Sequence, residues 1–311
     1  MKSFLFIFLT VVALGCQSDS EEKYNLARQH FSNEEFLKAR LLLEELVMEN
    51  PENPKFLNDL GVCFSKTGNK SKAISFYEKA IEIDSNYALS YVNKAYIFLQ
   101  FEEYEKSVEN YTKAIALDYS SVDVFNFRGV GYAKLNKDSF AILDFTKSIE
   151  LDSLCAKCYR NRSTSHEKSS NFDKALADLE TAIELEPQNQ KGFSFRGRLY
   201  TLNRRYREAI EDLTDAIKLD SANYENFFYR ANAKYDSGLY EESLPDYDEA
   251  IKLASTEIDN IWCSKGNALL KLGQNFEALR SYEEAIRVNP YNIEAIRKKR
   301  SVEVKFGFRR M

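Results

Sequence analysis

Small and large apolar side chains recur along this chain with a period of 34 residues. One series of small residues keeps this spacing throughout: Gly61, Ala95, Gly129, Ser163, Gly197 and Ala231. A series of large residues keeps it at another offset: Tyr77, Tyr111, Phe145, Leu179, Leu213 and Tyr247. Large side chains that face small ones at matching offsets are typical of closely packed helices. The pattern therefore predicts two packed helices in each repeat.

Eight repeats account for most of the chain. Neither helix of a repeat can bury its apolar stripe alone, so neighbouring repeats must stack into a continuous core. Residues 293–311 follow the last repeat, and we expect them to form a C-terminal capping helix that is polar enough to close the stack. The predicted repeats are 20–53, 54–87, 88–121, 122–155, 156–189, 190–223, 224–258 and 259–292.

The last repeat carries aromatic, small and large apolar residues and a proline at fixed places in its sequence. They are Trp262, Gly266, Leu269, Ala278, Tyr282, Ala285 and Pro290. This set resembles the pattern of the tetratricopeptide repeat (TPR) family. The resemblance implies an all-α fold, a right-handed superhelical solenoid of helix–turn–helix repeats. It also implies a protein–protein interaction scaffold or adaptor that binds a partner segment in its concave groove and is not an enzyme.

The N-terminus has the features of a targeting segment. Lys2 precedes an apolar run from Phe4 to Ala13, which is too short to span a bilayer and is typical of a signal peptide, here residues 1–15. Its end, Gly15-Cys16, is similar to the lipobox of bacterial lipoproteins. That resemblance implies acyl chains such as palmitate on Cys16, a linker at 16–19, and anchoring in the cell envelope, expected at the outer membrane. The periplasmic and surface faces both stay open, as does an ordinary signal peptide with an incidental cysteine.

Charge and composition exclude several function classes. The chain has 48 acidic and 43 Lys and Arg residues, with a net charge of −5. Nucleic-acid-binding proteins normally carry a basic footprint, so we expect no nucleic-acid partner. The two histidines, His30 and His166, fall where other repeats carry packing aromatic residues. No catalytic arrangement, phosphate-binding loop or metal-ligand set stands outside the repeat pattern, so we expect no catalytic residues, cofactor or metal.

An arginine on the first helix co-varies with an aspartate on the second. Four repeats contain both residues, whereas the first two repeats are apolar at both positions. This co-variation predicts an Arg–carboxylate contact inside each of the four repeats. The predicted pairs are Arg128–Asp144, Arg162–Asp178, Arg196–Asp212 and Arg230–Asp246.

Cys155 and Cys158 form a C-x-x-C motif in the turn between the fourth and fifth repeats. A structural zinc site needs about four ligands, and no second cysteine pair is present. Attached haem requires a histidine next, where Tyr159 stands. Two interpretations stay open: a local disulfide in an oxidising compartment, or two free thiols.

The TPR resemblance implies that positions 2, 5, 9, 12 and 13 of each first helix line the concave surface. These positions hold ten basic and five acidic residues, and the third repeat adds an apolar patch. We therefore expect an acidic partner segment with an apolar anchor. Two alternatives stay open: the basic side chains only solvate this face, or the groove binds glycan or peptidoglycan. The predicted groove residues are Lys55, Asn58, Lys66, Leu89, Val92, Tyr96, Leu99, Asn126, Lys134, Arg160, Lys168, Arg198, Asn232, Asn267 and Lys271.

The seventh repeat departs from the pattern in three ways. Lys234 takes a position that is aromatic elsewhere, Pro245 falls inside the expected second helix, and an extra residue lies between Ala254 and Ile258. Proline removes a backbone donor and clashes with the preceding turn. We therefore expect this repeat to be the weakest link of the stack.

Overall fold

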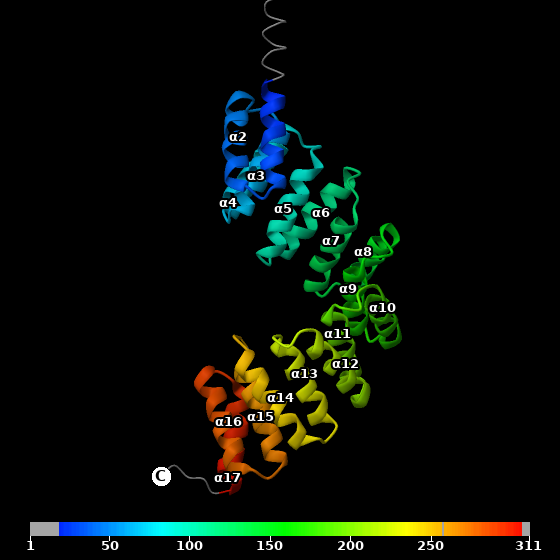
Figure 1. Ribbon diagram of the computed structural model, residues 1–311, viewed down its shortest axis with the longest axis vertical. Coiled ribbons are helices and arrows are strands. Elements are labelled where there is room, and N and C mark those ends of the chain that lie inside the picture. The colour runs from blue at the N-terminus through cyan, green and yellow to red at the C-terminus, as the bar shows by residue number, and fades with distance from the viewer. Residues whose placement is uncertain (1–18, 257, 307–311) are drawn as a thin grey trace, which may run out of the picture. The chain divides into compact units, whose positions relative to one another are not determined.

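The computed structural model describes residues 19–256 and 258–306, and the regular structure of those residues is helical throughout (Figure 1). The predicted all-α fold is confirmed. The signal peptide and Cys16 lie outside the described residues. None of the described helices combines the length and apolar character that crossing a membrane requires. The helices are residues 19–32, α2 (Phe36–Glu49), α3 (Pro54–Lys66), α4 (Lys70–Ile83), α5 (Ala88–Gln100), α6 (Tyr104–Ala116), α7 (Val122–Lys134), α8 (Asp138–Leu151), α9 (Ala156–Lys168), α10 (Phe172–Leu185), α11 (Gln190–Leu202), α12 (Tyr206–Leu219), α13 (Tyr224–Asp236), α14 (Tyr240–Leu253), α15 (Ile258–Lys271), α16 (Asn275–Val288) and α17 (Ile293–Phe306).

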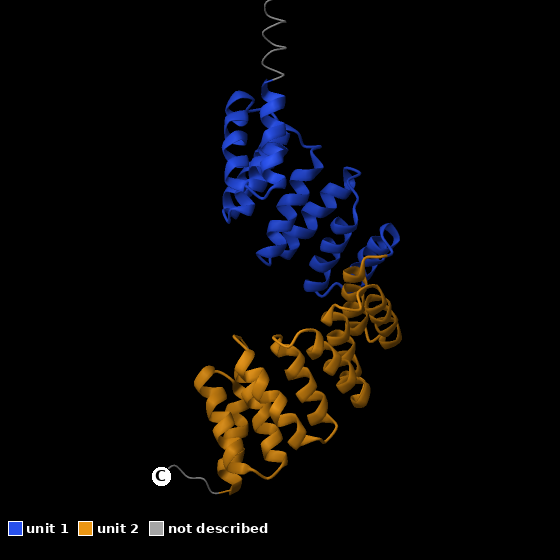
Figure 2. Cartoon of the chain, viewed as in Figure 1, with its two compact units in different colours: residues 1–153 blue, residues 154–311 orange. Residues whose placement is uncertain are grey.

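The chain forms two compact units, residues 1–153 and 154–311 (Figure 2). Within each unit, every labelled helix packs against the next one along the chain. The first helices of neighbouring repeats also touch: α3 with α5 and α5 with α7 in unit 1, and α11 with α13 and α13 with α15 in unit 2. Each unit therefore has a face built from first helices, and the predicted groove residues belong to these helices.

Small residues on the first helix make room for large residues on the second. A Cβ atom added at Gly61 would lie 2.6 Å from Cε1 of Tyr77, which is almost fully buried. Gly197 has the same relation to Leu213, at 2.6 Å from its Cγ. Such close approach leaves no room for a larger side chain at the glycine position. The predicted packing of small against large residues is confirmed at these positions.

The turn inside each repeat contains one residue in the left-handed region, with φ between 57° and 90°. Only three of these residues are glycine, although glycine adopts this conformation at the lowest cost. The repeated geometry turns the chain in the same way each time and keeps the repeats in phase. The residues are Glu34, Gly68, Glu102, Asn136, Ser170, Arg204, Gly238 and Gly273.

The four predicted Arg–Asp pairs form inside their repeats. In the sixth repeat, Nε and Nη2 of Arg196 donate to the two carboxylate oxygens of Asp212 at 2.7 and 2.8 Å. The other three pairs make the same two-pronged contact at 2.6–2.9 Å. Arg230 also reaches the preceding repeat, where Nη1 donates to Oγ1 of Thr214 at 3.0 Å. The prediction is confirmed, and the arginines are structural rather than a basic stripe for ligands.

The last helix differs from the expected polar cap. Ala295 and Val302 of α17 are buried in the cluster formed with α16. The outer face, however, exposes Ile293, Ile296 and Val304, with 79%, 43% and 78% of their surface accessible. Ile293 and Val304 lie on the side of the helix opposite Ala295 and Val302, whereas Ile296 lies on its flank, because an α-helix has 3.6 residues per turn. The exposed surface of α17 is therefore mixed, since polar residues such as Glu294, Arg297 and Arg300 are exposed on the same helix.

Candidate partner-binding surfaces

Unit 1 contains a pocket of about 430 Å³ on its first-helix face. The helix at 19–32, α3 and α5 supply most of its walls, together with Leu43 and Tyr87. Its apolar lining includes Phe31, Val62 and Leu89. A mostly apolar concavity with a few polar groups is the usual form of a binding site.

A hydrogen-bond network forms one wall of the unit 1 pocket. Oδ1 of Asn58 accepts from Oγ of Ser90 at 3.1 Å and from Nδ2 of Asn93 at 3.0 Å. Nδ2 of Asn58 donates to Oδ1 of Asp59 at 3.0 Å, and the Tyr24 hydroxyl donates to the other carboxylate oxygen at 2.5 Å. Burial and this bond to Asp59 raise the pKa of Tyr24 well above its usual value. The network joins three neighbouring first helices and occupies both oxygens of Asp59.

Two cations stand beside this network. The ammonium of Lys55 lies 4.4 Å from the centre of the Tyr24 ring, and Arg28 also lines the pocket. Neither side chain makes an ion pair within residues 19–256 and 258–306. Both residues are exposed to solvent. The unit 1 pocket therefore combines an apolar lining and the carboxylate of Asp59 with two positive charges that make no ion pair among the described residues.

Two of the predicted groove residues of unit 1 are almost fully buried. Asn58 and Asn126 each expose only 2% of their surface. The amide of Asn58 is used to connect α3 with α5, as described above. Both residues are therefore interior polar groups of the stack, and Asn58 also contributes to the lining of the unit 1 pocket.

The remaining predicted residues of unit 1 keep part of their surface accessible. Leu89 and Tyr96 are 36% and 41% exposed, and Tyr96 packs on Phe127 with ring centroids 5.3 Å apart. Val92 and Leu99 are half-buried, while Lys66 and Lys134 are exposed. Of these residues, only Leu89 lines the described pocket.

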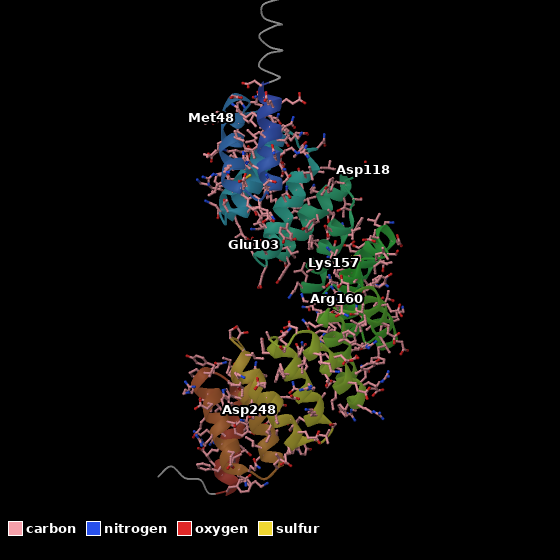
Figure 3. The ribbon with its side chains drawn as sticks, in the orientation of Figure 1. Met48, Glu103, Asp118, Lys157, Arg160 and Asp248 are labelled. Atoms are coloured by element: carbon pink, nitrogen blue, oxygen red, sulfur yellow. A yellow bond between two sulfur atoms is a disulfide. The ribbon has the colours of Figure 1, made fainter. Side chains whose placement is uncertain are left out.

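In unit 2, Arg160 is structural. It is 8% exposed, and its Nη1 lies 2.7 Å from Oε2 of Glu186. Burial alone would raise the pKa of Glu186, but hydrogen bonds from Arg160 and Asn189 outweigh this effect and lower it. Lys157 lies near Arg160 on α9 (Figure 3) but is exposed. The assignment of Arg160 to a ligand-binding groove is corrected, because its charge is neutralised inside the protein.

A second pocket, of about 360 Å³, lies in unit 2 on α11, α13 and α15. Three predicted residues line it: Arg198, Asn232 and Asn267. The Tyr247 hydroxyl donates to Oδ1 of Asn232 at 2.8 Å, and the Tyr282 hydroxyl donates to Oδ1 of Asn267 at 2.9 Å. These bonds hold both amide groups in place. The predicted Lys168 and Lys271 are exposed outside this pocket.

The remaining cysteines divide into two classes. Cys155 and Cys158 are joined by a disulfide at the N-terminus of α9. Cys63 and Cys263 are free and buried, and burial raises the pKa of each thiol to about 12. A thiol with so high a pKa is a poor nucleophile at neutral pH.

Family models described as tetratricopeptide repeat match residues 54–87, 88–121, 161–224, 196–258 and 260–292. Together they span more than half of the chain. The chain belongs to the tetratricopeptide repeat family.

Three solved structures share the fold of this TPR protein. YrrB, a TPR protein with an unusual peptide-binding site, is 21% identical, with a TM-score of 0.53 over 59% of this chain and 95% of its own. The APC/C hetero-tetramer Cut9–Hcn1 is 14% identical, with a TM-score of 0.64 over 86% and 52%. PilF of Pseudomonas aeruginosa is 17% identical, with a TM-score of 0.58 over 70% and 98%. At these identities the likeness shows the fold alone.

One curated relative is similar in sequence to part of the TPR array. The uncharacterized protein ycf37 of Porphyra purpurea is 34% identical over 80 residues, which is 24% of this chain and 46% of the relative. The chain therefore matches less than half the length of that relative.

Position 6 of the first helices also lines both TPR pockets, and the predicted groove positions omit it. Asp59 and Asn93 occupy it in unit 1, and Tyr229 and Ser264 occupy it in unit 2. A residue one place after position 5 lies about 100° further around the helix. Asp, Asn, Tyr and Ser share no chemical type, so the repeat pattern alone carried no signal for this position.

Proposed function

We propose that this TPR protein is a protein-interaction scaffold, and that its unit 1 pocket binds a partner segment that carries a carboxylate next to an apolar side chain. The observation that carries the proposal is the position of Arg28 and Lys55, two cations without ion pairs, beside the apolar lining of the pocket. An acidic side chain of a partner would give these charges the counter-ion that residues 19–256 and 258–306 do not supply.

The energetics suit one anchoring side chain. Burial of a leucine-sized side chain against Phe31, Val62 and Leu89 contributes about 1.5–3 kcal/mol. A carboxylate beside Arg28 and Lys55 adds charge complementarity, which increases specificity and the association rate. Asp59 opposes such a ligand less than a free carboxylate would, because both of its oxygens already accept hydrogen bonds.

The test uses two fluorescent decapeptides with the same leucine anchors and either glutamate or lysine at the intervening positions. We expect the glutamate peptide to bind more tightly in fluorescence anisotropy. Arg28→Gln and Lys55→Gln should each weaken it about fivefold to tenfold. Lys113→Gln is the matched control, since it removes the same charge from an exposed residue of the second helix α6, outside the pocket. Equal binding of both peptides, an equal effect of Lys113→Gln, or preferential binding of a soluble peptidoglycan fragment would refute the proposal.

We also propose that the chain is a lipoprotein of the cell envelope, anchored at the outer membrane through acyl chains on Cys16. The support is the apolar run that ends at Gly15-Cys16. The disulfide between Cys155 and Cys158 is compatible with an oxidising compartment. Cys16→Ala should abolish metabolic labelling with a palmitate analogue and release the protein in soluble form. A wild-type protein that stays in the membrane fraction without any label contradicts this proposal.

A further inference from the structure

The unit 2 pocket has the opposite charge from the one in unit 1. Two charged residues line it, Arg198 and Asp236. Nη2 of Arg198 lies 2.8 Å from Oε2 of Glu167, so the charge of this arginine is neutralised. Within residues 19–256 and 258–306, no hydrogen bond or ion pair holds the carboxylate of Asp236. The charge that the pocket offers to a ligand is therefore negative.

Asp236 stands where a negative charge is unfavourable for the protein. It is the last residue of α13, at the end of the helix where the backbone dipole favours cations. Four other repeats place a lysine at this position: Lys66, Lys134, Lys168 and Lys271. The nearby cation Lys234 does not compensate, because its Nζ pairs with Oδ2 of Asp246 at 2.8 Å.

Asp236 is a partly desolvated carboxylate beside the ring of Tyr235. The residue stands at the pocket rim with one side exposed, and partial desolvation raises the pKa of its carboxyl. Burial raises the pKa of Tyr235, and neighbouring Tyr240, Asp236 and Glu294 raise it further. The contributions of Asp236 and Glu294 to the Tyr235 shift have the sign of a negative environment beside that ring, whereas the Asp236 shift comes from desolvation.

The walls of the unit 2 pocket suit the alkyl stem of a long cation. Tyr229, Tyr235 and Tyr247 line it, and Tyr235 packs on Tyr240 with ring centroids 5.3 Å apart. Tyrosine rings attract an ammonium or guanidinium group through their electron-rich faces. Apolar ring surface also accommodates the methylene groups of a lysine or arginine.

We propose that the unit 2 pocket binds a lysine or arginine side chain of a partner protein, with Asp236 as the counter-ion and the tyrosines as its walls. This inference rests on the proposed scaffold function only in that a partner protein supplies the cation. It assigns to unit 2 a preference opposite to that of unit 1, and opposite to the basic groove expected from the sequence.

The test uses three short peptides, acetyl-Ala-X-Ala-amide, in which X is lysine, acetyl-lysine or glutamate. Binding is followed by NMR through the side-chain amide resonances of Asn232 and Asn267, which line the pocket. We expect the lysine peptide to shift both resonances and the other two peptides to bind at least about fivefold more weakly. Affinity for the lysine peptide should fall on acidification, starting at a higher pH than for an ordinary surface aspartate, since desolvation raises the pKa of Asp236.

Asp236→Asn keeps the shape of the side chain and removes its charge, and it should reduce the affinity for the lysine peptide about fivefold or more. Glu241→Gln is the matched control, since it removes the same charge from an exposed residue outside the pocket. Equal binding of the lysine and acetyl-lysine peptides, no shift at either asparagine, or unchanged affinity in Asp236→Asn would overturn the inference.

The two pockets can fail independently. Arg28→Gln and Lys55→Gln should leave the binding of the lysine peptide unchanged, because both residues belong to unit 1. A failed lysine-peptide test with a positive glutamate-decapeptide test refutes only the unit 2 site. The reverse result refutes only the unit 1 site.

Discussion

At the scale of single residues, the interior of this TPR array depends on paired charges. The side chain of Asp212 is 10% exposed, and that of its partner Arg196 is 20% exposed. A charge that is buried to this degree needs a partner, because without one nothing offsets the free-energy cost of removing the charge from water. The first two repeats avoid this cost by carrying apolar residues at both positions.

Arg196→Ala should destabilise the sixth repeat by about 1–3 kcal/mol, because it leaves the Asp212 carboxylate buried and unpaired. Arg196→Leu combined with Asp212→Leu, which copies the first repeats, should recover much of that loss. Local hydrogen exchange in α11 and α12 measures both effects. A double variant as unstable as the sum of its single changes would show that the two side chains act separately.

His166 should make stability dependent on pH. It is 8% exposed, its Nδ1 has no hydrogen-bond partner, and burial lowers its pKa. Of the charges that face it, Asp178 opposes this shift, whereas Arg162 and Lys174 add to it. Because the unfolded chain then binds the proton more readily, stability should fall as the pH drops below about 6.5, the ordinary histidine value. His166→Phe should reduce this slope in thermal melts at a series of pH values, and an unchanged slope would contradict the assignment.

At the scale of helices, the seventh repeat retains the irregularities seen in the sequence. Pro245 lies inside α14, where it cannot donate the backbone hydrogen bond of its turn. Lys234 replaces an aromatic packing residue and forms two polar contacts with α14. Its Nζ donates to the carbonyl oxygen of Glu242 at 3.2 Å and pairs with Asp246. The contacts attach α13 to α14, but they replace buried ring surface with a charge.

Native-state hydrogen exchange should show the earliest opening of unit 2 in α13 and α14. One weak link in a stack of repeats opens without melting its neighbours. Pro245→Ala should raise protection there by about 1–3 kcal/mol, because alanine restores the missing donor. Protection in the wild type equal to that of α9 to α12 would mean that the packing compensates the irregularities.

At the scale of the whole molecule, contacts connect helices that are neighbours or next neighbours in the chain. Stability in such an array is approximately a sum of repeat terms and interface terms. Damage in one repeat should therefore stay local. Gly197 offers the test, since a Cβ there would lie 2.6 Å from Cγ of Leu213 and 3.2 Å from the carbonyl oxygen of Ala209.

Gly197→Val should destabilise the sixth repeat by about 1–3 kcal/mol through overpacking. Hydrogen exchange should accelerate in α11, α12 and their neighbours while unit 1 keeps its wild-type protection. Leu202→Ala is the control, because Leu202 is 62% exposed on the same helix. Equal loss of protection in unit 1 would show that the array unfolds as a single cooperative body.

The sequence by itself determined the repeat, the two helices of each repeat, and two kinds of contact made inside it: small against large residues and arginine with aspartate. Gly197 meets Leu213, and Arg196 meets Asp212, because each pair stands 16 positions apart within one repeat, a relation that the 34-residue period displays again and again. A contact between two fixed positions of the repeat recurs with the period of the repeat. Such a contact can therefore be recognised in a single sequence.

Only the tertiary structure decided which groove residues remain free to meet a partner. Arg160 is neutralised by Glu186, 26 positions away, and Arg198 by Glu167, 31 positions away. Asn58 is buried and accepts hydrogen bonds from Ser90 and Asn93 of the next repeat, while Asp236 has no polar partner in the part of the chain that the structure describes. These outcomes differ from repeat to repeat, because they depend on side chains that follow no period. Glu167, Ser90 and Asn93 come from a neighbouring repeat, whereas Glu186 stands at the end of the same repeat as Arg160. The availability of each groove charge is therefore a property of the stacked array.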